Sequence, residues 1–249
     1  MDLNLSGKVV LVTGSTRGIG LAIARAFVHE GATVVLNGRG TELPPQQAQS
    51  LGLDFVAGDV SEAEQARRVI AEILSKYATI DIVVANVGSG VSVPGGTEDS
   101  NEWLRMLSLN LLSATQVIEA AKSSLISSQG VVLCISSICG LADLGAPIAY
   151  SAAKAALNSY VRGTSALLGP HQVRINGLAP GNVFFPGSTW EKKLQQDQEG
   201  VEAMLKTKVP LGRFATPEEI ADVAVFLCSS RSSFVTGSIV VVDGGQTRS

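Results

Sequence analysis

The fold is decided by the stretch Lys8-Val9-Val10-Leu11-Val12-Thr13-Gly14-Ser15-Thr16-Arg17-Gly18-Ile19-Gly20. Its apolar first half predicts a strand over Lys8–Val12, and a helix is expected from about Gly18 to His29. Glycines between a strand and a helix allow a tight turn, and the unpaired N–H groups of the helix N-terminus can bind a pyrophosphate. The spacing G-x-x-x-G-x-G differs from the G-x-G-x-x-G fingerprint, so a glycine-rich turn without a ligand is the alternative interpretation.

Short apolar runs alternate with longer helical patterns along the rest of the chain. Further strands are expected over Thr33–Leu36, Asp54–Ala57, Asp81–Ala85, Gly130–Ile135, Arg174–Leu178 and Ile239–Val242. Helices are expected from Ser61, with Glu64 placed for a capping box, over about Asn101–Leu125, around Tyr150 and Lys154, and from Thr216, with Pro217 at N1 and Glu219 at N3. This alternation predicts a single α/β domain, a doubly wound parallel sheet with helices on both faces.

Residues 182–208 interrupt the alternation at the carboxyl end of a predicted strand. They contain Phe184-Phe185-Pro186-Gly187, Trp190 and a polar stretch, Lys192–Lys206, that is expected to be helical. A long insertion at this position predicts a substrate lid. Several apolar side chains either line a substrate pocket or simply pack the lid: Leu141, Leu144, Pro147, Phe184, Phe185 and Trp190.

Composition excludes several classes of protein. The net charge is −3 and no basic block occurs, so nucleic-acid binding is not expected. The longest apolar runs have the length of strands, so no membrane span is expected, and the N-terminus does not resemble a secretory signal. Three cysteines without a C-x-x-C pair indicate a cytoplasmic protein, and only two histidines, His29 and His171, argue against a zinc site.

The low content of charged residues bears on assembly. It is 16%, whereas soluble proteins average about 25%. Such a chain either buries extra surface between subunits or covers its sheet on both faces, which also consumes apolar residues.

A tyrosine and a lysine four residues apart, Tyr150 and Lys154, are predicted on one face of a helix. Hydride transfer to a carbonyl needs a proton donor beside the developing alkoxide. An unperturbed tyrosine has a pKa of about 10, and a neighbouring ammonium lowers it. We interpret Tyr150 as a general acid and the upstream Ser137 as the hydroxyl that holds the substrate oxygen. A Tyr-x-x-x-Lys pair by itself also fits a solvated helix surface.

The residues after the second predicted strand bear on the choice of cofactor. An acid there accepts a hydrogen bond from a ribose 2′-OH, whereas a basic residue favours a 2′-phosphate. Asn37-Gly38-Arg39 has no acid, and Arg39 and Arg17 could converge on a phosphate. The pattern favours NADP(H) over NAD, although both arginines could also be solvated loop residues. Asp59 either meets the adenine ring or is a turn residue.

In combination, these motifs resemble the short-chain dehydrogenase/reductase family, from Leu5 to about Gln246. The resemblance implies a Rossmann-like fold, a homotetramer and the catalytic residues Asn110, Ser137, Tyr150 and Lys154, with Asn110 anchoring a water of the proton relay. With the glycine turn and the two arginines, it implies that the cofactor contacts Gly14, Thr16, Arg17, Gly18, Ile19, Gly20, Arg39, Asp59, Val60, Asn86, Gly88, Tyr150, Lys154, Pro180, Gly181 and Val183.

Three departures from the family pattern stand out. The family's Asn-Asn-Ala-Gly is Ala85-Asn86-Val87-Gly88, so the hydrogen bonds of the first asparagine are missing. Phe185 replaces a threonine that often contacts the nicotinamide carboxamide, which leaves the Val183 backbone for that contact. The segment from Gly40 to Leu53 contains Pro44-Pro45, and its usual helix is expected to be shortened.

We therefore expect an NADP(H)-dependent oxidoreductase that interconverts a carbonyl and a secondary alcohol on a small-molecule substrate. An NAD-dependent alcohol or sugar dehydrogenase, a non-catalytic dinucleotide-binding regulator, and an isomerase or dehydratase on the same fold are the alternatives. Ketoacyl thioesters, sugars and cyclic alcohols all remain open as substrates.

Overall fold

The computed structural model describes residues 2–40 and 53–247. The shortened helix expected between Gly40 and Leu53 lies outside the described residues. None of the described helices is long and apolar enough to span a membrane.

Seven parallel strands form one sheet in the order β3-β2-β1-β4-β5-β6-β7. Their bounds are β1 Val9–Val12, β2 Thr33–Gly38, β3 Asp54–Ala57, β4 Ile82–Ala85, β5 Val131–Ile135, β6 Arg174–Pro180 and β7 Ile239–Val242. Every predicted strand is present, and the ends move by at most two residues. Asp81 lies just before β4. Its carboxylate accepts hydrogen bonds from Lys8 Nζ and Val9 N, both at 2.9 Å, and these contacts tie the starts of β1 and β4 together.

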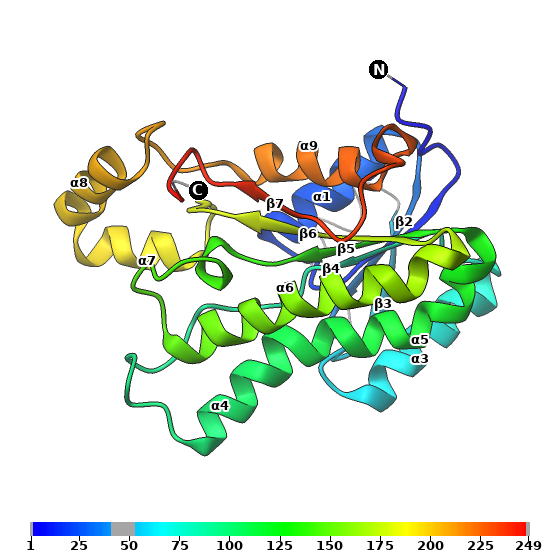
Figure 1. The fold of residues 1–249 in the computed structure, drawn as a ribbon, viewed down its shortest axis with the longest axis horizontal. Helices are drawn as coiled ribbons and strands as arrows, with labels where there is room; N and C mark the ends of the chain where they lie inside the picture. Colours follow the sequence, from blue (N-terminus) through cyan, green and yellow to red (C-terminus); the bar gives the residue numbers. More distant parts are fainter. Residues whose placement is uncertain (1, 41–52, 248–249) are drawn as a thin grey trace.

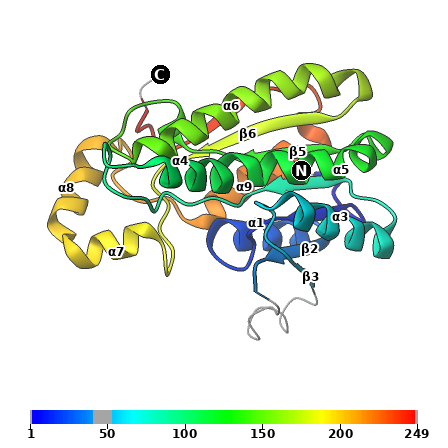
Figure 2. The same cartoon turned by 90° about the horizontal axis from the view of Figure 1, so that it is seen from below.

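Helices cover both faces of this sheet (Figures 1 and 2). One layer consists of α1 (Gly18–His29) and α9 (Pro217–Cys228), and the other of α3 (Ala63–Tyr77), α5 (Ser113–Ser128) and α6 (Ile148–Leu168). Alternate strand residues face the two layers: Val10 and Val12 belong to the core with α1 and α9, whereas Val9 and Leu11 belong to the core with the other layer. The predicted doubly wound α/β fold is confirmed, and burial on both faces explains why the strands are almost entirely apolar.

The expected capping box at Ser61 is wrong. Helix α3 begins two residues later, at Ala63, and its N-cap residue Glu62 makes no side-chain cap. Ser61 instead donates its hydroxyl and backbone N–H to Asp59 Oδ1, at 2.6 and 3.0 Å, in a turn that follows β3. A local turn therefore uses the hydroxyl that the helix would have needed.

The capping box of α9 is confirmed. Glu219 N donates to Thr216 Oγ1 at 3.3 Å, and Thr216 N donates to Glu219 Oε2 at 2.9 Å. Both partners lie within three residues of each other, so this motif could be recognised from local sequence alone.

Two expected helices are each divided in the structure. The long helix consists of α4 (Ser100–Leu107), a π-helical turn η1 (Ser108–Leu112) and α5. The helix expected over Lys192–Lys206 is a pair, α7 (Thr189–Gln196) and α8 (Gln198–Lys208). The second break occurs at Asp197, whose Oδ1 accepts from Gly200 N at 2.9 Å and so caps a new helix.

The strand order reverses between β1 and β4. The chain runs outward from β1 to β2 and β3, then crosses back to β4 on the other side of β1. The loops after β1 and β4 therefore diverge and leave a crevice at the carboxyl ends of the strands, where ligands of this fold class bind. Helices α7 and α8 lie beyond this end of the sheet, at the left of Figure 1.

Candidate active site

The glycine turn after β1 requires all three of its glycines. Gly14 and Gly18 have φ angles of 60° and 56°, in the left-handed region that favours glycine. A Cβ at Gly20 would lie 2.7 Å from Gly14 O, so only glycine fits there. Asn86, which follows β4, holds the turn by donating Nδ2–H to Thr13 O at 2.9 Å and to Gly14 O at 3.1 Å.

Ser137 and Tyr150 are brought together by two elements that pack backbone to backbone. Ser137 is the N-cap of a short 3₁₀ turn, η2 (Ile138–Gly140), and its Oγ accepts from Cys139 N at 3.1 Å. A Cβ at Gly140 would lie only 2.7 Å from the carbonyl carbon of Lys154 in α6, so η2 lies directly against the helix of the predicted Tyr150–Lys154 pair. Ser137 and Tyr150 line the same cavity, and the Ser137 hydroxyl lies near enough to the Tyr150 phenol to affect its pKa.

The neighbouring serine has a different place. Ser136 is buried and donates to Asn158 Oδ1 at 2.6 Å, so it links β5 to α6. Of the serine pair, Ser137 therefore presents its hydroxyl to Tyr150.

Burial shifts the pKa values of the predicted catalytic pair in opposite directions. Desolvation raises the pKa of Tyr150 to about 12, and the nearby Ser137 hydroxyl only partly opposes this. Burial lowers the pKa of Lys154 to about 8, and its ammonium donates to Ile135 O at 2.7 Å. The predicted lowering of the Tyr150 pKa by Lys154 is therefore absent, because the ammonium is bound to Ile135 O and burial raises the pKa of the phenol. Tyr150 is consequently neutral near pH 7, which is the form that can donate a proton.

Asn110 lies in the π-helical turn and is completely buried. Its Oδ1 accepts from Ser89 N at 2.9 Å, and its Nδ2 donates to Ser89 O and Met106 O at 3.2 and 3.1 Å. A Cβ at Gly88 would lie 2.9 Å from Asn110 Oδ1 and 3.0 Å from Lys154 Nζ, so these three residues meet. π-Helical turns inside α-helices occur frequently at functional sites.

Most predicted site residues line one cavity of about 590 Å³, here called the inner cleft. It runs from the glycine turn to Tyr150, and its walls include Gly14, Arg17, Ile19, Gly20, Asn86, Gly88, Ser137, Tyr150, Lys154, Pro180, Gly181 and Val183. A second cavity of about 670 Å³, the outer chamber, lies between η2 and helices α7 and α8. The two cavities share Ile138, Cys139, Gly145, Ala146, Asn182, Trp190 and Lys193, so they adjoin.

Comparison with known proteins agrees with this geometry. A family model described as Enoyl-(Acyl carrier protein) reductase matches residues 14–247. The 3-oxoacyl-(acyl-carrier-protein) reductase FabG of Chlamydia muridarum is 35% identical over 252 residues, which cover 98% of this chain and 99% of the relative. The chain belongs to the short-chain dehydrogenase/reductase family. It is accordingly an oxidoreductase.

Two further members of the short-chain dehydrogenase/reductase family show how varied its substrates are. The L-fucose dehydrogenase of Mus musculus is 35% identical over 244 residues, which cover 96% of this chain and 88% of the relative. The crystal structure of L-sorbose reductase from Gluconobacter frateurii, complexed with NADPH and L-sorbose, superposes with a TM-score of 0.92 at 31% identity and covers 100% of both chains.

Five predicted cofactor residues, Thr16, Gly18, Arg39, Asp59 and Val60, lie outside the walls of the inner cleft. Asp59 accepts from Ser61, as its interpretation as a turn residue requires, and the Val60 side chain is buried in the core beside α3. Arg39 is exposed after β2. Arg17 instead donates Nη1–H to Gly187 O at 3.3 Å, and among the described residues the two arginines share no hydrogen-bond partner.

The segment 182–208 lies against the glycine turn, a contact that sequence analysis missed. Besides the bond from Arg17 to Gly187, the ring of Phe185 covers Gly18, where a Cβ would lie 2.6 Å from it. Phe185 stands where the family often has a threonine, and its ring therefore lies over the start of α1. The start of the segment is held beside the residues that precede α9, because Val183 pairs with Ala215.

Six apolar side chains were interpreted either as the wall of a substrate pocket or as packing within the lid. Four of them line a cavity and two do not. Leu144 and Trp190 line the outer chamber, and Pro147 and Phe185 line the inner cleft. Leu141 and Phe184 line neither, and Phe184 packs on Phe214 with ring centroids 5.8 Å apart.

Sequence analysis also missed Glu98, which caps α6 from a distant loop. Pro147, the N-cap residue of α6, has no side-chain acceptor. Glu98 Oε1 accepts from Ile148 N at 3.1 Å and from Ala149 N at 3.4 Å, while Oε2 accepts from Gly96 N at 2.6 Å. Backbone hydrogen bonds lower the pKa of this carboxyl. Proline has no side-chain oxygen that could accept a hydrogen bond from the first turn of the helix. Pro147 at the N-cap therefore indicates that the acceptor must come from another part of the chain.

We predict that Glu98→Ala lowers both thermal stability and kcat, because Tyr150 lies in the first turn of α6, which Glu98 orders. Glu98→Gln retains an acceptor at the same place and should keep most of both. Thermal melts and steady-state rates of the two variants test this, with Glu64→Ala on the exposed face of α3 as the control. The stability difference should be present above pH 4.5 and disappear as the pH falls, since the lowered pKa means that the cap is lost on protonation. Equal kcat in all three variants would contradict the positioning role.

Proposed function

We propose that this chain is an NADP(H)-dependent oxidoreductase that interconverts a carbonyl and a secondary alcohol on a small molecule, with Tyr150 as general acid and base. The observation that carries the proposal is that the hydroxyls of Ser137 and Tyr150 lie together in a cleft that begins at the glycine turn. A proton donor and an oxygen-holding hydroxyl are thereby placed at one point.

The start of α1 fits a dinucleotide. Its N-cap, Arg17, has a side chain without an acceptor, so the first-turn N–H groups remain available to a pyrophosphate. Gly14, Gly18 and Gly20 allow close approach of the backbone, and Gly181 and Val183 would meet the nicotinamide end. Bound NADPH supplies the hydride that reduces the carbonyl carbon.

The protein's own part in the reaction is to hold and protonate the substrate oxygen. Ser137 Oγ holds this oxygen, and neutral Tyr150 donates its hydroxyl proton to it as the alcohol forms. Lys154, beside Asn110 and Gly88, links Tyr150 to the proton relay. In the opposite direction the proton relay first takes the hydroxyl proton of Tyr150, and the resulting phenolate accepts the proton of the alcohol.

Several features support NADP(H) as the cofactor. Gly38 removes the carboxylate that would repel a 2′-phosphate, Arg39 follows it, and the related L-sorbose reductase was crystallised with NADPH. An NAD-dependent alcohol or sugar dehydrogenase is the second candidate.

The test is a panel of carbonyl compounds, including 3-oxoacyl thioesters, ketosugars and cyclic ketones, assayed with NADPH and with NADH. Oxidation of NADPH with at least one class is expected. Substrate turnover without nucleotide oxidation would indicate an isomerase or dehydratase, and nucleotide binding without any turnover would indicate a regulator. Either result would overturn the proposal.

We also propose that residues 182–208 form the lid and that the protein is a cytoplasmic homotetramer. The exposed apolar side chains include Phe234 and Val241 in and before β7, and Leu104 and Leu112 on α4 and η1. Exposed apolar surface supports an interface between subunits.

Sedimentation should show a tetramer at micromolar concentration for the unmodified protein. Phe234→Lys is expected to remove the β7 interface and leave a smaller species, because the fully exposed ring would otherwise be buried between subunits. Glu64→Lys on α3 serves as the charge control. A monomeric unmodified protein would contradict the assembly.

A further inference from the structure

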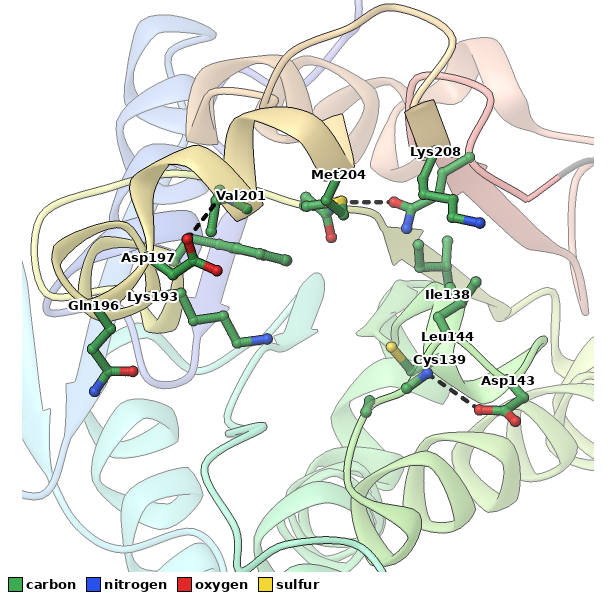
Figure 3. A pocket seen from close by; sticks show the side chains of 16 residues that line it. Ile138, Cys139, Asp143, Leu144, Lys193, Gln196, Asp197, Val201, Met204 and Lys208 are labelled. Atoms are coloured by element: carbon green, nitrogen blue, oxygen red, sulfur yellow. Dashed lines mark hydrogen bonds between the residues drawn. The ribbon is translucent and has the colours of Figure 1, made fainter. Parts of the chain in front are cut away.

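The outer chamber carries a set of polar groups that the proposed reaction does not use. Its apolar walls include Ile138, Leu144, Trp190, Val201 and Met204, and its ionisable side chains are Asp143, Lys193, Asp197 and Lys208. Figure 3 shows Lys193 extending its ammonium into the chamber from α7, with Lys208 on another side. Because the chamber adjoins the inner cleft, a substrate held at Ser137 and Tyr150 can extend into it.

The two acids of the chamber are engaged by backbone N–H groups. Asp197 Oδ1 accepts from Gly200 N at 2.9 Å and caps α8, and Asp143 Oδ1 accepts from Gly145 N at 3.2 Å in a turn. Both carboxylates thus serve local structure, and their charges are partly offset by N–H dipoles.

The two lysines have no such partners. In residues 2–40 and 53–247, no carboxylate oxygen lies within 4.0 Å of the ammonium of Lys193 or Lys208. Lys193 Nζ lies 4.5 Å from the centroid of the Trp190 ring, a cation–π contact that favours a position at the junction of the two cavities. The contact leaves its N–H donors available.

A neutral donor adds to the same wall. Gln246 Oε1 accepts from Asn182 Nδ2 at 2.9 Å, so the amide N–H groups of Gln246 remain as donors toward the chamber. Two ammonium groups and an amide therefore offer donors, whereas one oxygen of each carboxylate is already bound to a backbone N–H.

We propose that the substrate carries a negatively charged oxygen group, a carboxylate or a phosphate, remote from its carbonyl, and that Lys193 and Lys208 bind this group. This inference rests on the proposed function, since it places the carbonyl at Ser137 and Tyr150. The apolar walls accommodate the carbon skeleton between the two ends. A volume of about 670 Å³ lies in the range of small-molecule sites. Both lysines belong to residues 182–208, so binding the anion also holds this segment against the substrate.

The experiment compares matched pairs of carbonyl compounds with NADPH as the reductant. One arm uses 4-oxopentanoate, 5-oxohexanoate and 7-oxooctanoate, each beside its methyl ester, and the other uses dihydroxyacetone phosphate beside dihydroxyacetone. The readout is the ratio of kcat/KM for the charged compound to that for its neutral partner. The carboxylate and phosphate arms identify which anion is bound, and the chain-length series measures the spacing.

The unmodified enzyme should favour the charged member of at least one pair by about tenfold or more, the effect of one charge-assisted contact. The double variant Lys193→Ala/Lys208→Ala should reduce this ratio at least about tenfold, mainly through KM, and Lys193→Glu should reduce it further. Lys206→Ala, an exposed position on α8 outside the chamber walls, is the matched control. Added salt should also lower the ratio, because ions screen exposed charges.

Two results would overturn the proposal. Neutral partners reduced as well as the charged compounds would show that no anion is recognised, while leaving the proposed reductase activity intact. A ratio unchanged in the double variant would show that these lysines do not recognise it. If no carbonyl in this set or in the wider panel is reduced, the proposed function itself fails, and this inference fails with it.

Discussion

Replacing Tyr150 by phenylalanine should reduce kcat by about 10²–10⁴-fold, the usual contribution of a positioned general acid. The change removes only the hydroxyl that lies beside Ser137 in the inner cleft. The ring makes ordinary contacts, and even a Cβ at Gly90 would lie 3.8 Å from it, so the variant should fold normally. Steady-state rates with the best carbonyl substrate give kcat, and titration with NADPH followed by fluorescence should give an unchanged Kd.

A matched control lies on the same helix. Burial also raises the pKa of Tyr160 to about 12, but Tyr160 lies outside the inner cleft, in a groove lined by α3 and α5. Tyr160→Phe should therefore retain kcat. A Tyr150→Phe variant with most of its activity would show that another group donates the proton. An equal loss in both variants would point to damage to α6 rather than to chemistry.

Changing the residues at the end of β2 should reverse the choice of cofactor. Arg39→Ala is expected to weaken NADPH binding about ten- to a hundredfold and to leave NADH nearly unaffected, because a guanidinium forms paired hydrogen bonds with a phosphate. Gly38→Asp places a carboxylate where it repels a 2′-phosphate and accepts from a ribose 2′-OH. The ratio of kcat/KM for NADPH to that for NADH should invert.

The structure shapes the design of this second experiment. A Cβ at Gly38 would lie 2.8 Å from Thr16 Cγ2, so the aspartate needs room. The double variant Thr16→Ser/Gly38→Asp removes that methyl group, and Thr16→Ser alone is its control. Arg17→Ala should weaken both cofactors alike, since Arg17 contacts Gly187 rather than the β2 end. A clear NADH preference in the unmodified enzyme would contradict the assignment of NADP(H).

Structural features that depend only on residues close together in the chain could be recognised from the sequence. The strand runs are apolar because both faces of the sheet are covered, and this burial makes a parallel sheet between two helical layers predictable. The Thr216 capping box and the Tyr150–Lys154 spacing are properties of single helices. Ser61 failed because two local motifs competed for one hydroxyl, and the turn with Asp59 prevailed.

The sequence by itself thus determined the doubly wound fold and the glycine turn, and it predicts Tyr150 as the proton donor, since each depends on residues a few positions apart. Only the tertiary structure decided what surrounds them. Glu98 reaches the start of α6 across 50 residues, and Arg17 reaches Gly187 across 170. The lysines of the outer chamber likewise come to face η2 only through the tertiary structure. Such contacts depend on how the loops at the carboxyl ends of the strands converge, and no spacing along the chain encodes that convergence.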